Sequence, residues 1–245
     1  MNYHWNWGIY FQTVQAGEET YLDWLISGLG WTLAVALTAW LIALAMGAVM
    51  GTLRTLPGRA PLAIGNAWVE VFRNVPLLVQ LFLWFFVVPE LLPRDLALWV
   101  KQDMPAKEFV TAAICLGLFT SARIAEQVRA GIQSLPRGQR MAALALGFTL
   151  PQAYRYVILP MAFRIIIPPL TSEFMNIFKN SSVAFAIGVL ELTFQARQMQ
   201  EDSEQGIETY LAVTVLYFLC AFLANRGMAF IERRTRVPGF IAAGK

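Results

Sequence analysis

The sequence predicts an all-α integral membrane protein with about five membrane-spanning helices. Of its 245 residues, 57% are hydrophobic and only 14% are charged, whereas a soluble domain usually has about 25% charged residues. The longest uncharged run, from Trp24 to Leu53, exceeds the roughly 20 apolar residues that a helix needs to cross the hydrocarbon core. Because several apolar runs follow it, a buried helix in a large soluble core is a poor explanation.

The first predicted span is Trp24–Leu53, and the polar, acidic segment before it argues against a cleaved signal peptide. The other spans are predicted at about Leu62–Leu92, Phe109–Gln133, Tyr156–Leu190 and Thr209–Ile231. The second and fourth spans contain prolines, which are tolerated where protein or a cavity, rather than lipid, surrounds the backbone.

The distribution of charge predicts the orientation of the chain. The segment before Trp24 has acidic residues and no Lys or Arg, and the predicted loop Glu191–Glu208 is acidic, with Arg197 as its one basic residue. The loops after the first and third spans and the end of the chain are basic. Since basic loops stay in the cytoplasm, we expect residues 1–23 to lie outside, 24–232 to form the transmembrane domain and 233–245 to be a cytoplasmic tail.

Several classes of site are excluded or disfavoured by composition. His4 is the only histidine, and Cys115 and Cys220 both lie in apolar runs, which is neither a metal-ligand nor a disulfide pattern. The net charge of +3 and the pI near 9.0 come from the loops, which indicates membrane topology rather than nucleic-acid binding. No G-x-x-x-x-G-K-[ST] phosphate loop is present, so any ATP must be bound by another chain and no cofactor is expected on this one.

A helix–glycine–helix segment separates the third and fourth predicted spans. Residues Gln139–Leu146 favour a helix by propensity, and Gly147 can take the left-handed conformation that ends it. Thr149 can cap a second helix, Pro151 fits its first turn, and Pro160 is expected to break or bend the chain where it enters the membrane. This pattern alone leaves two readings open: a docking element, or an amphipathic helix lying on lipid headgroups.

Motifs along nearly the whole chain resemble the type I permeases of binding-protein-dependent ABC importers, in the polar amino-acid branch. The family signature, EAA with a glycine at fixed spacing and then LP, is similar to MAALALG at Met141–Gly147 and to Leu159–Pro160. Flanking matches are EQVRAGIQSLPRGQ at Glu126–Gln139, VEVFRNVPLLVQLFLWF at Val69–Phe85 and FRIIIPPLTSEFMNIFKNSS at Phe163–Ser182. The opening HWNWGIYFQ and the PELLP at Pro89–Pro93 are most similar to glutamate/aspartate import permeases.

The resemblance implies a bacterial inner-membrane protein with a periplasmic N-terminal segment. Two permease subunits, the same chain or a similar one, would form the pore, two ABC ATPase subunits would bind ATP and Mg²⁺, and a periplasmic binding protein would deliver an amino acid. A coupling helix at about residues 139–150 would dock on one ATPase. The residues expected to serve this coupling are Arg137, Gly138, Gln139, Ala142, Ala143, Gly147, Leu159 and Pro160.

The chain departs from the signature at Met141, where the family usually has Glu. We therefore hypothesise that Ala142, Ala143 and Gly147 form the docked surface and that Arg137 and Arg140 supply polar contacts.

Ionisable residues within the spans are candidates for the substrate pathway. Arg123, Glu126 and Arg129 lie three residues apart, so one reading is a ladder of ion pairs on a single helix. The other reading is that Arg123 binds an anionic group of the substrate, because guanidinium matches carboxylate bidentately.

A second polar stripe lies on the fourth span, at Glu173, Asn176, Lys179 and Asn180. It predicts a wet surface, either the pathway or the interface between permease subunits. The Pro168–Pro169 pair nearby would free backbone carbonyls.

The predicted function is ATP-driven import of a polar amino acid, with glutamate or aspartate as the leading substrate. The same machine could carry glutamine or a basic amino acid instead. A self-sufficient secondary transporter would typically have two related halves, which five unequal spans do not offer. A membrane-embedded enzyme would need a nucleophile, a metal cluster or a carboxylate pair that a chain with one histidine does not provide.

Overall fold

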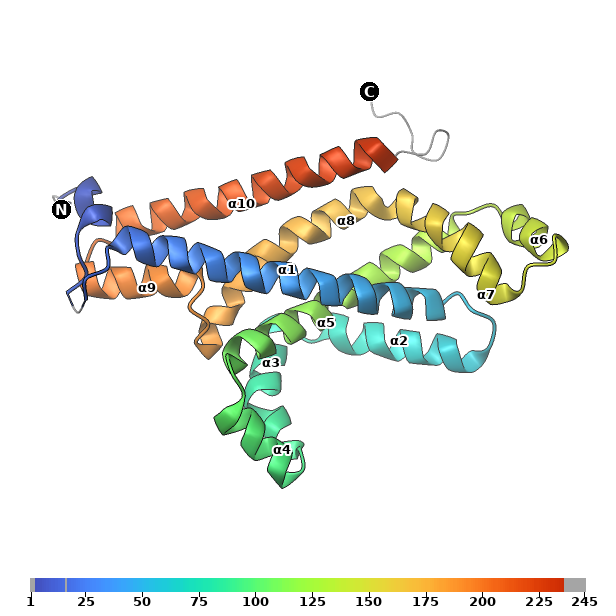
Figure 1. Cartoon of the computed structure of the whole chain (residues 1–245), viewed down its shortest axis with the longest axis horizontal. Helices are drawn as coiled ribbons and strands as arrows, with labels where there is room; N and C mark the ends of the chain where they lie inside the picture. The colour runs from blue at the N-terminus through green and yellow to red at the C-terminus, as the bar shows by residue number, and fades with distance from the viewer. Residues whose placement is uncertain (1–2, 16, 236–245) are drawn as a thin grey trace. The chain divides into compact units, whose positions relative to one another are not determined.

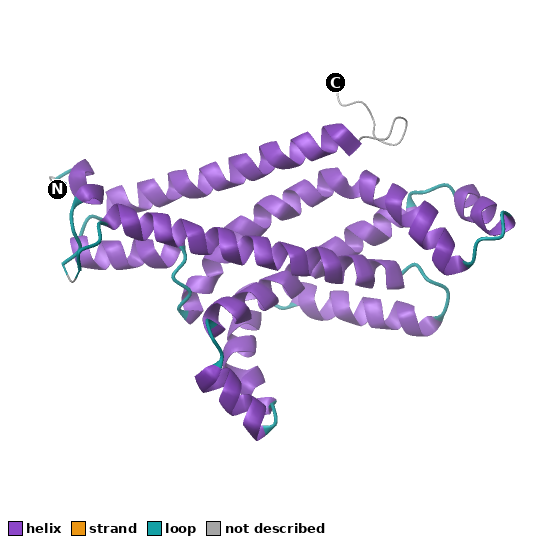
Figure 2. Ribbon diagram, viewed as in Figure 1, coloured by secondary structure: helices purple, strands orange, loops and turns teal. Residues whose placement is uncertain are grey.

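The structure, a computed structural model, describes residues 3–15 and 17–235, so residues 236–245 of the expected tail and residues 1, 2 and 16 of the expected N-terminal segment lie outside the described part. The described residues are helical with short connections (Figures 1 and 2). Their one β contact is an isolated antiparallel bridge between Thr13 and Thr20. The chain divides into two compact units: unit 1 comprises residues 1–39, 76–116 and 176–222, and unit 2 comprises residues 40–75, 117–175 and 223–245.

The α-helices, labelled in Figure 1, follow in the order α1 (Tyr21–Leu53), α2 (Arg59–Asn74), α3 (Leu77–Phe82), α4 (Arg94–Leu98), α5 (Lys107–Gln133), α6 (Arg137–Ala145), α7 (Leu150–Ala153), α8 (Leu159–Ser181), α9 (Leu192–Ser203) and α10 (Gly206–Thr235). Short 3₁₀ segments lie at Trp7–Phe11, Val88–Leu91 and Ser182–Ile187. Short π-helical segments lie at Leu83–Val87, Trp99–Asp103 and Tyr154–Ile158.

Four helical segments of the described chain are long and apolar enough to cross a membrane: Tyr21–Leu53, Lys107–Gln133, Leu150–Ile187 and Gly206–Thr235. They confirm the first, third, fourth and fifth predicted spans, with ends that differ by a few residues. A fifth span results if the pair Arg59–Asn74 and Leu77–Leu91 counts as one.

The second predicted span, Leu62–Leu92, is not one continuous helix. The α2 helix ends at Asn74, and Val75 has extended backbone angles, φ −96° and ψ 131°. Pro76 explains the break, because proline lacks an N–H and pushes the preceding residue out of the helical conformation. Hydropathy detected the apolar length here but not this interruption.

Of the break or bend predicted at Pro160, the break does not occur, because the helical segment Leu150–Ile187 runs through this residue. The chain adapts one turn earlier: the Leu159 N–H donates to the carbonyl of Tyr154, five residues back, in a π turn. The wider turn lies next to the position where Pro160 removes an N–H. Pro168 and Pro169 likewise lie inside α8 without ending it.

The acidic loop predicted at Glu191–Glu208 is mostly the helix α9. Glu191 caps its first turn by accepting hydrogen bonds from the backbone N–H groups of Thr193 and Phe194. One face of α9 then enters the core of unit 1, whose buried members are Ile9, Val14, Tyr21, Leu25, Leu192, Ala196, Met199 and Val213. The acidic residues at its end serve as acceptors: the Tyr21 hydroxyl donates to Asp202 at 2.6 Å.

Candidate functional site

The helix α6 ends in a Schellman motif, all of it within unit 2. Gly147 has φ +87°, the left-handed conformation that the sequence predicts for it. Its N–H donates to the Leu144 carbonyl at 3.0 Å, and the Phe148 N–H donates to the Ala143 carbonyl at 3.2 Å. These two bonds satisfy carbonyls that the end of a helix leaves unpaired. Gly147 therefore fixes a sharp turn that a residue with a Cβ would strain.

The next helix starts as the sequence predicts. The Thr149 N–H donates to Gln152 Oε1 at 2.8 Å, and Pro151 lies in the first turn of α7. Tyr154 then anchors the element, because its buried hydroxyl donates to the carbonyl of Thr55 at 2.9 Å. This hydrogen bond joins the segment after α1 to the segment that leads into α8.

Most of the predicted coupling residues are accessible. Arg137, Gly138, Ala142, Gly147 and Pro160 are exposed, while Gln139 and Leu159 are half-buried.

Ala143 is the exception, with only 3% of its surface exposed. It cannot present its methyl group to a partner, so the hypothesis that it belongs to the docked surface is corrected. Met141, at the position that departs from the family signature, is 62% exposed.

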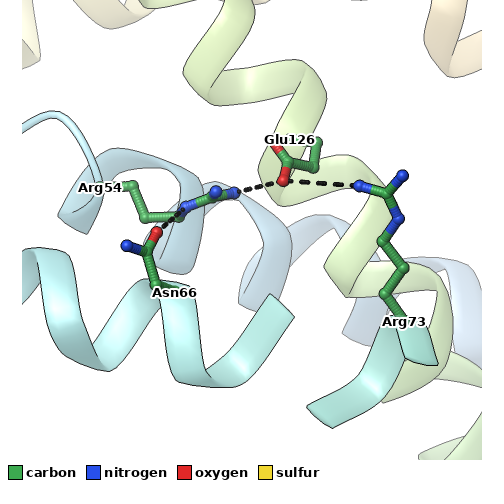
Figure 3. Close-up of polar contacts among 4 residues, drawn as sticks. All are labelled: Arg54, Asn66, Arg73 and Glu126. Atoms are coloured by element: carbon green, nitrogen blue, oxygen red, sulfur yellow. Dashed lines mark hydrogen bonds and ion pairs between the residues drawn. The ribbon is translucent and has the colours of Figure 1, made fainter. Parts of the chain in front are cut away.

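Glu126 is the hub of a polar cluster in unit 2 (Figure 3). Its Oε1 lies 3.0 Å from Nη1 of Arg54 and 3.8 Å from Nη1 of Arg73. The Arg54 Nε–H also donates to Oδ1 of Asn66 at 2.8 Å. The side chain of Arg54 is only 6% exposed, against 33% for Glu126 and 61% for Arg73. Glu126 therefore joins α5 both to the end of α1 and to α2.

This cluster overturns the predicted ladder of Arg123, Glu126 and Arg129. The reason is that both partners of Glu126 come from other segments, Arg54 just after α1 and Arg73 on α2. Residue spacing within one helix could not reveal them. Arg129 has no ion-pair partner among the described residues.

Arg123 pairs instead with Glu173 of α8, a member of the second predicted polar stripe. Its Nη1 lies 3.6 Å from Glu173 Oε2, and its guanidinium carbon lies 5.0 Å from the centre of the Phe119 ring. Arg123 is 41% exposed, whereas Glu173 is 13% exposed. Gln127 also reaches Glu173, at 3.5 Å. Because the Arg123 guanidinium stays accessible while Glu173 holds it, Arg123 can also bind a second carboxylate.

The other residues of the predicted stripe continue along α8 into unit 1. Asn176 and Asn180 are half-buried and Lys179 is exposed. Within the described part of the chain, the side chains of these three residues make no hydrogen bond or ion pair; the Lys179 backbone carbonyl accepts a hydrogen bond from the Ser182 hydroxyl. The described residues also contain no group of three His, Cys, Asp or Glu side chains placed to hold a metal ion.

Comparison with known proteins gives concordant results. Residues 43–237 match the family described as "Binding-protein-dependent transport system inner membrane component". The glutamate/aspartate import permease GltJ of Escherichia coli (strain K12) is 48% identical over 241 residues, covering 98% of both chains. The probable glutamine ABC transporter permease GlnM of Bacillus subtilis (strain 168) is 35% identical, covering 70% of this chain and 74% of that one.

A crystal structure of an amino acid ABC transporter with histidines has a chain of the same fold. It superimposes with a TM-score of 0.74 at 32% identity, covering 87% of this chain and 95% of that one.

Proposed function

The chain belongs to the family of binding-protein-dependent transport system inner membrane components, and we propose that it is the permease of an importer for acidic amino acids. The observation that carries this proposal is the element α6–Gly147–α7. It is a short exposed helix and a left-handed turn between two membrane spans, followed by the helix α7, which begins the second of these spans. Such an element has the form of a docking site for a partner at the membrane surface.

The partner we propose for this element is an ATPase subunit that binds ATP and Mg²⁺. No phosphate loop occurs in the chain, so hydrolysis belongs to another polypeptide. Gly138, Ala142 and Gly147 would form the docked face, since all three are exposed and small enough for close backbone approach. The basic residues on this side of the spans favour the cytoplasm for α6 and the C-terminal tail, and the periplasm for the N-terminal segment.

The proposed substrates are glutamate and aspartate, delivered by a periplasmic binding protein through a pore of two permease subunits. The similarity to a glutamate/aspartate permease supports this choice, and so does Arg123. A dicarboxylic amino acid carries a second carboxylate, which an accessible guanidinium can bind with two hydrogen bonds. The polar residues Asn176, Lys179 and Asn180 of α8 would form a wet surface, either on the substrate pathway or at the interface with the second permease.

Affinity purification of the tagged chain from native membranes, with mass spectrometry of its companions, tests the assembly. An ATPase subunit in the eluate supports the importer, and a second permease beside it gives the composition of the pore. An eluate that holds this chain alone would favour an autonomous transporter.

The Gly147→Asp variant tests the docking element itself. It should reach the membrane at normal levels and lose both ATPase binding and transport; full transport at normal levels would contradict docking through this turn.

Uptake of labelled glutamate, aspartate, glutamine and arginine in cells that depend on this permease tests the substrate. Glutamine uptake that equals or exceeds glutamate uptake would favour the glutamine reading, which the similarity to a glutamine permease keeps open. Uptake that persists without ATP under an ion gradient would contradict the importer altogether.

A further inference from the structure

A cavity of about 570 Å³ lies beside α6 in unit 2. Arg54 and Thr55, just after α1, form one part of its wall, and Ile132 near the end of α5 forms another. Residues of α6, among them Arg137, Gln139 and Arg140, and Tyr154 of the π turn also line it. The residues proposed for the docked face, Gly138, Ala142 and Gly147, do not line this cavity.

The wall of the cavity is basic. It contains three arginines and no acidic residue. The charge of Arg54 is neutralised by Glu126, but Arg137 and Arg140 are exposed and have no ion-pair partner among the described residues. They lie three residues apart and therefore on one side of α6. Two unneutralised guanidinium groups in the wall of one cavity match an anion with several oxygen acceptors, such as a phosphate group.

The surrounding sequence supports an anionic ligand. Between Glu126 and Glu173 the chain has no acidic residue, and all of its charged residues there are arginines, at Arg129, Arg137, Arg140, Arg155 and Arg164. The first turn of α6 adds to the positive potential, because Pro136 at its N-cap provides no side-chain acceptor for the free N–H groups.

The position of the cavity indicates where the anion comes from. Its wall includes the residues that follow the first span, the last turn of the α5 span and the first turns of the span Leu150–Ile187. The ends of membrane-spanning helices lie at the level of the lipid headgroups. Basic pockets between such helix ends bind the headgroups of anionic lipids.

We propose that this cavity binds the phosphate headgroup of an anionic phospholipid. Arg137 and Arg140 hold the phosphate, and the apolar side chains of Ile132 and Met141 border the glycerol end of the acyl chains. The site requires only that this part of unit 2 lies at the level of the lipid headgroups. It does not depend on whether α6 faces the cytoplasm or the periplasm.

A lipid fits the cavity better than an acidic segment of the ATPase. Gly138 and Ala142, the residues of α6 proposed above for the docked face, do not line the cavity. Arg137, Gln139 and Arg140 do line it, so we assign the two arginines to the lipid instead of the docking contacts expected from the sequence. One helix can therefore contact lipid on one side and the ATPase on another. Only the identity of the second partner, the ATPase, rests on the proposed function.

The test uses the full chain, purified with any companion subunits. The three probes are the anionic phospholipid phosphatidylglycerol, the zwitterionic phospholipid phosphatidylcholine, and inorganic phosphate. The midpoint of thermal unfolding is measured against the concentration of each probe, and native mass spectrometry counts retained lipid. Phosphatidylglycerol should raise the midpoint and phosphatidylcholine should not. The Arg140→Gln variant should need roughly tenfold more phosphatidylglycerol for the same shift, because one charge-assisted contact is lost.

Two further variants separate the site from general effects of charge and folding. Arg140→Lys keeps the charge and should retain most of the lipid response. Arg155→Gln removes an exposed arginine that lies outside the cavity, with its guanidinium carbon 5.6 Å from the centre of the Tyr156 ring, and should respond like the wild type. An equal loss in Arg155→Gln would overturn the proposal.

The remaining outcomes identify other occupants. An equal shift with the same concentration of inorganic phosphate would replace the lipid by a free phosphate. An Arg140→Gln variant with normal lipid binding but without bound ATPase would assign the cavity to the ATPase. If no ATPase accompanies even the wild type, the proposed function fails, while the comparison of lipid binding still decides the lipid site.

Discussion

Arg54 and Glu126 form an ion pair with 3.0 Å between Nη1 and Oε1, and the Arg54 side chain is only 6% exposed. Arg54 is the first residue after α1, and Glu126 lies in the second half of α5. A guanidinium this deeply buried is stable only with its charge compensated. The pair therefore fixes the end of α1 against α5, and Arg54 also lines the cavity beside α6.

Replacing Glu126 by Gln should lower the free energy of unfolding by about 2 kcal/mol. The substitution leaves the buried charge of Arg54 without a counter-charge, and the loss is moderate because Glu126 itself is one third exposed. Chemical denaturation in detergent measures it. Arg73→Gln is the matched control: Arg73 is 61% exposed and 3.8 Å from the same oxygen, so its removal should cost less than about 0.5 kcal/mol. Equal losses would mean that burial of Arg54 is not the cause.

Replacing Gly51 by Ala should destabilise the packing of α1 on α5. A Cβ at Gly51 would lie 2.6 Å from the Ala125 carbonyl oxygen and 2.7 Å from Val128 Cβ, so the two helices would have to separate. We expect a loss of about 1–3 kcal/mol, measured as a shift of the unfolding midpoint. Gly30→Ala, on the same helix with no such neighbour within 4 Å among the described residues, should change stability by less than about 0.5 kcal/mol. A similar loss at both positions would point to a general effect of glycine in α1.

The sequence predicted those features that depend on neighbours along the chain. Hydropathy located the spans because their apolar length is a local property, and Gly147 was recognised because left-handed backbone strongly favours glycine. Leu192, Ala196 and Met199 have helical spacing and could have revealed α9. The acidic residues around them led instead to the prediction of a loop.

The partners of the charged residues were beyond a reading of the sequence alone. Spacing of three residues suggested that Arg123 and Glu126 pair with each other, but each finds its partner on another segment, Glu173 and Arg54 respectively. Which helix faces lie together depends on tertiary packing. The cavity beside α6 depends on it too, because its wall combines residues from three separate parts of the chain.

Replacing Arg123 by Gln should reduce uptake of glutamate and aspartate by roughly tenfold or more, because a charge-assisted bond to the substrate is lost. Uptake in membrane vesicles measures it, with ATPase co-purification as the check on assembly. Glu173→Gln gives the decisive contrast: it frees Arg123 from its 3.6 Å partner, and so should lower the KM for glutamate if the substrate carboxylate competes with Glu173. Loss of assembly in both variants would instead assign the pair a structural role.

The stability of unit 1 should depend on pH through Glu191, a fully buried carboxyl group. Its oxygens accept from the backbone N–H groups of Thr193 and Phe194, at 3.0 and 2.9 Å, and from the Tyr217 hydroxyl at 2.6 Å. Burial nevertheless raises the pKa of Glu191 above its ordinary value of 4.5, with these hydrogen bonds opposing the shift.

The native state therefore holds this proton more tightly than the unfolded state does. The contribution of Glu191 to stability is fully present below its ordinary pKa and is lost as the pH rises through the raised pKa of the native state. The midpoint of thermal unfolding should therefore fall as the pH rises from about 4 to about 7, and Glu191 should account for this fall. Glu191→Gln, which cannot ionise, should remove that fall, whereas Glu201→Gln, at an exposed carboxyl on the same helix, should leave it in place. Parallel curves for the wild type and Glu191→Gln would show that the buried carboxyl does not set the pH dependence.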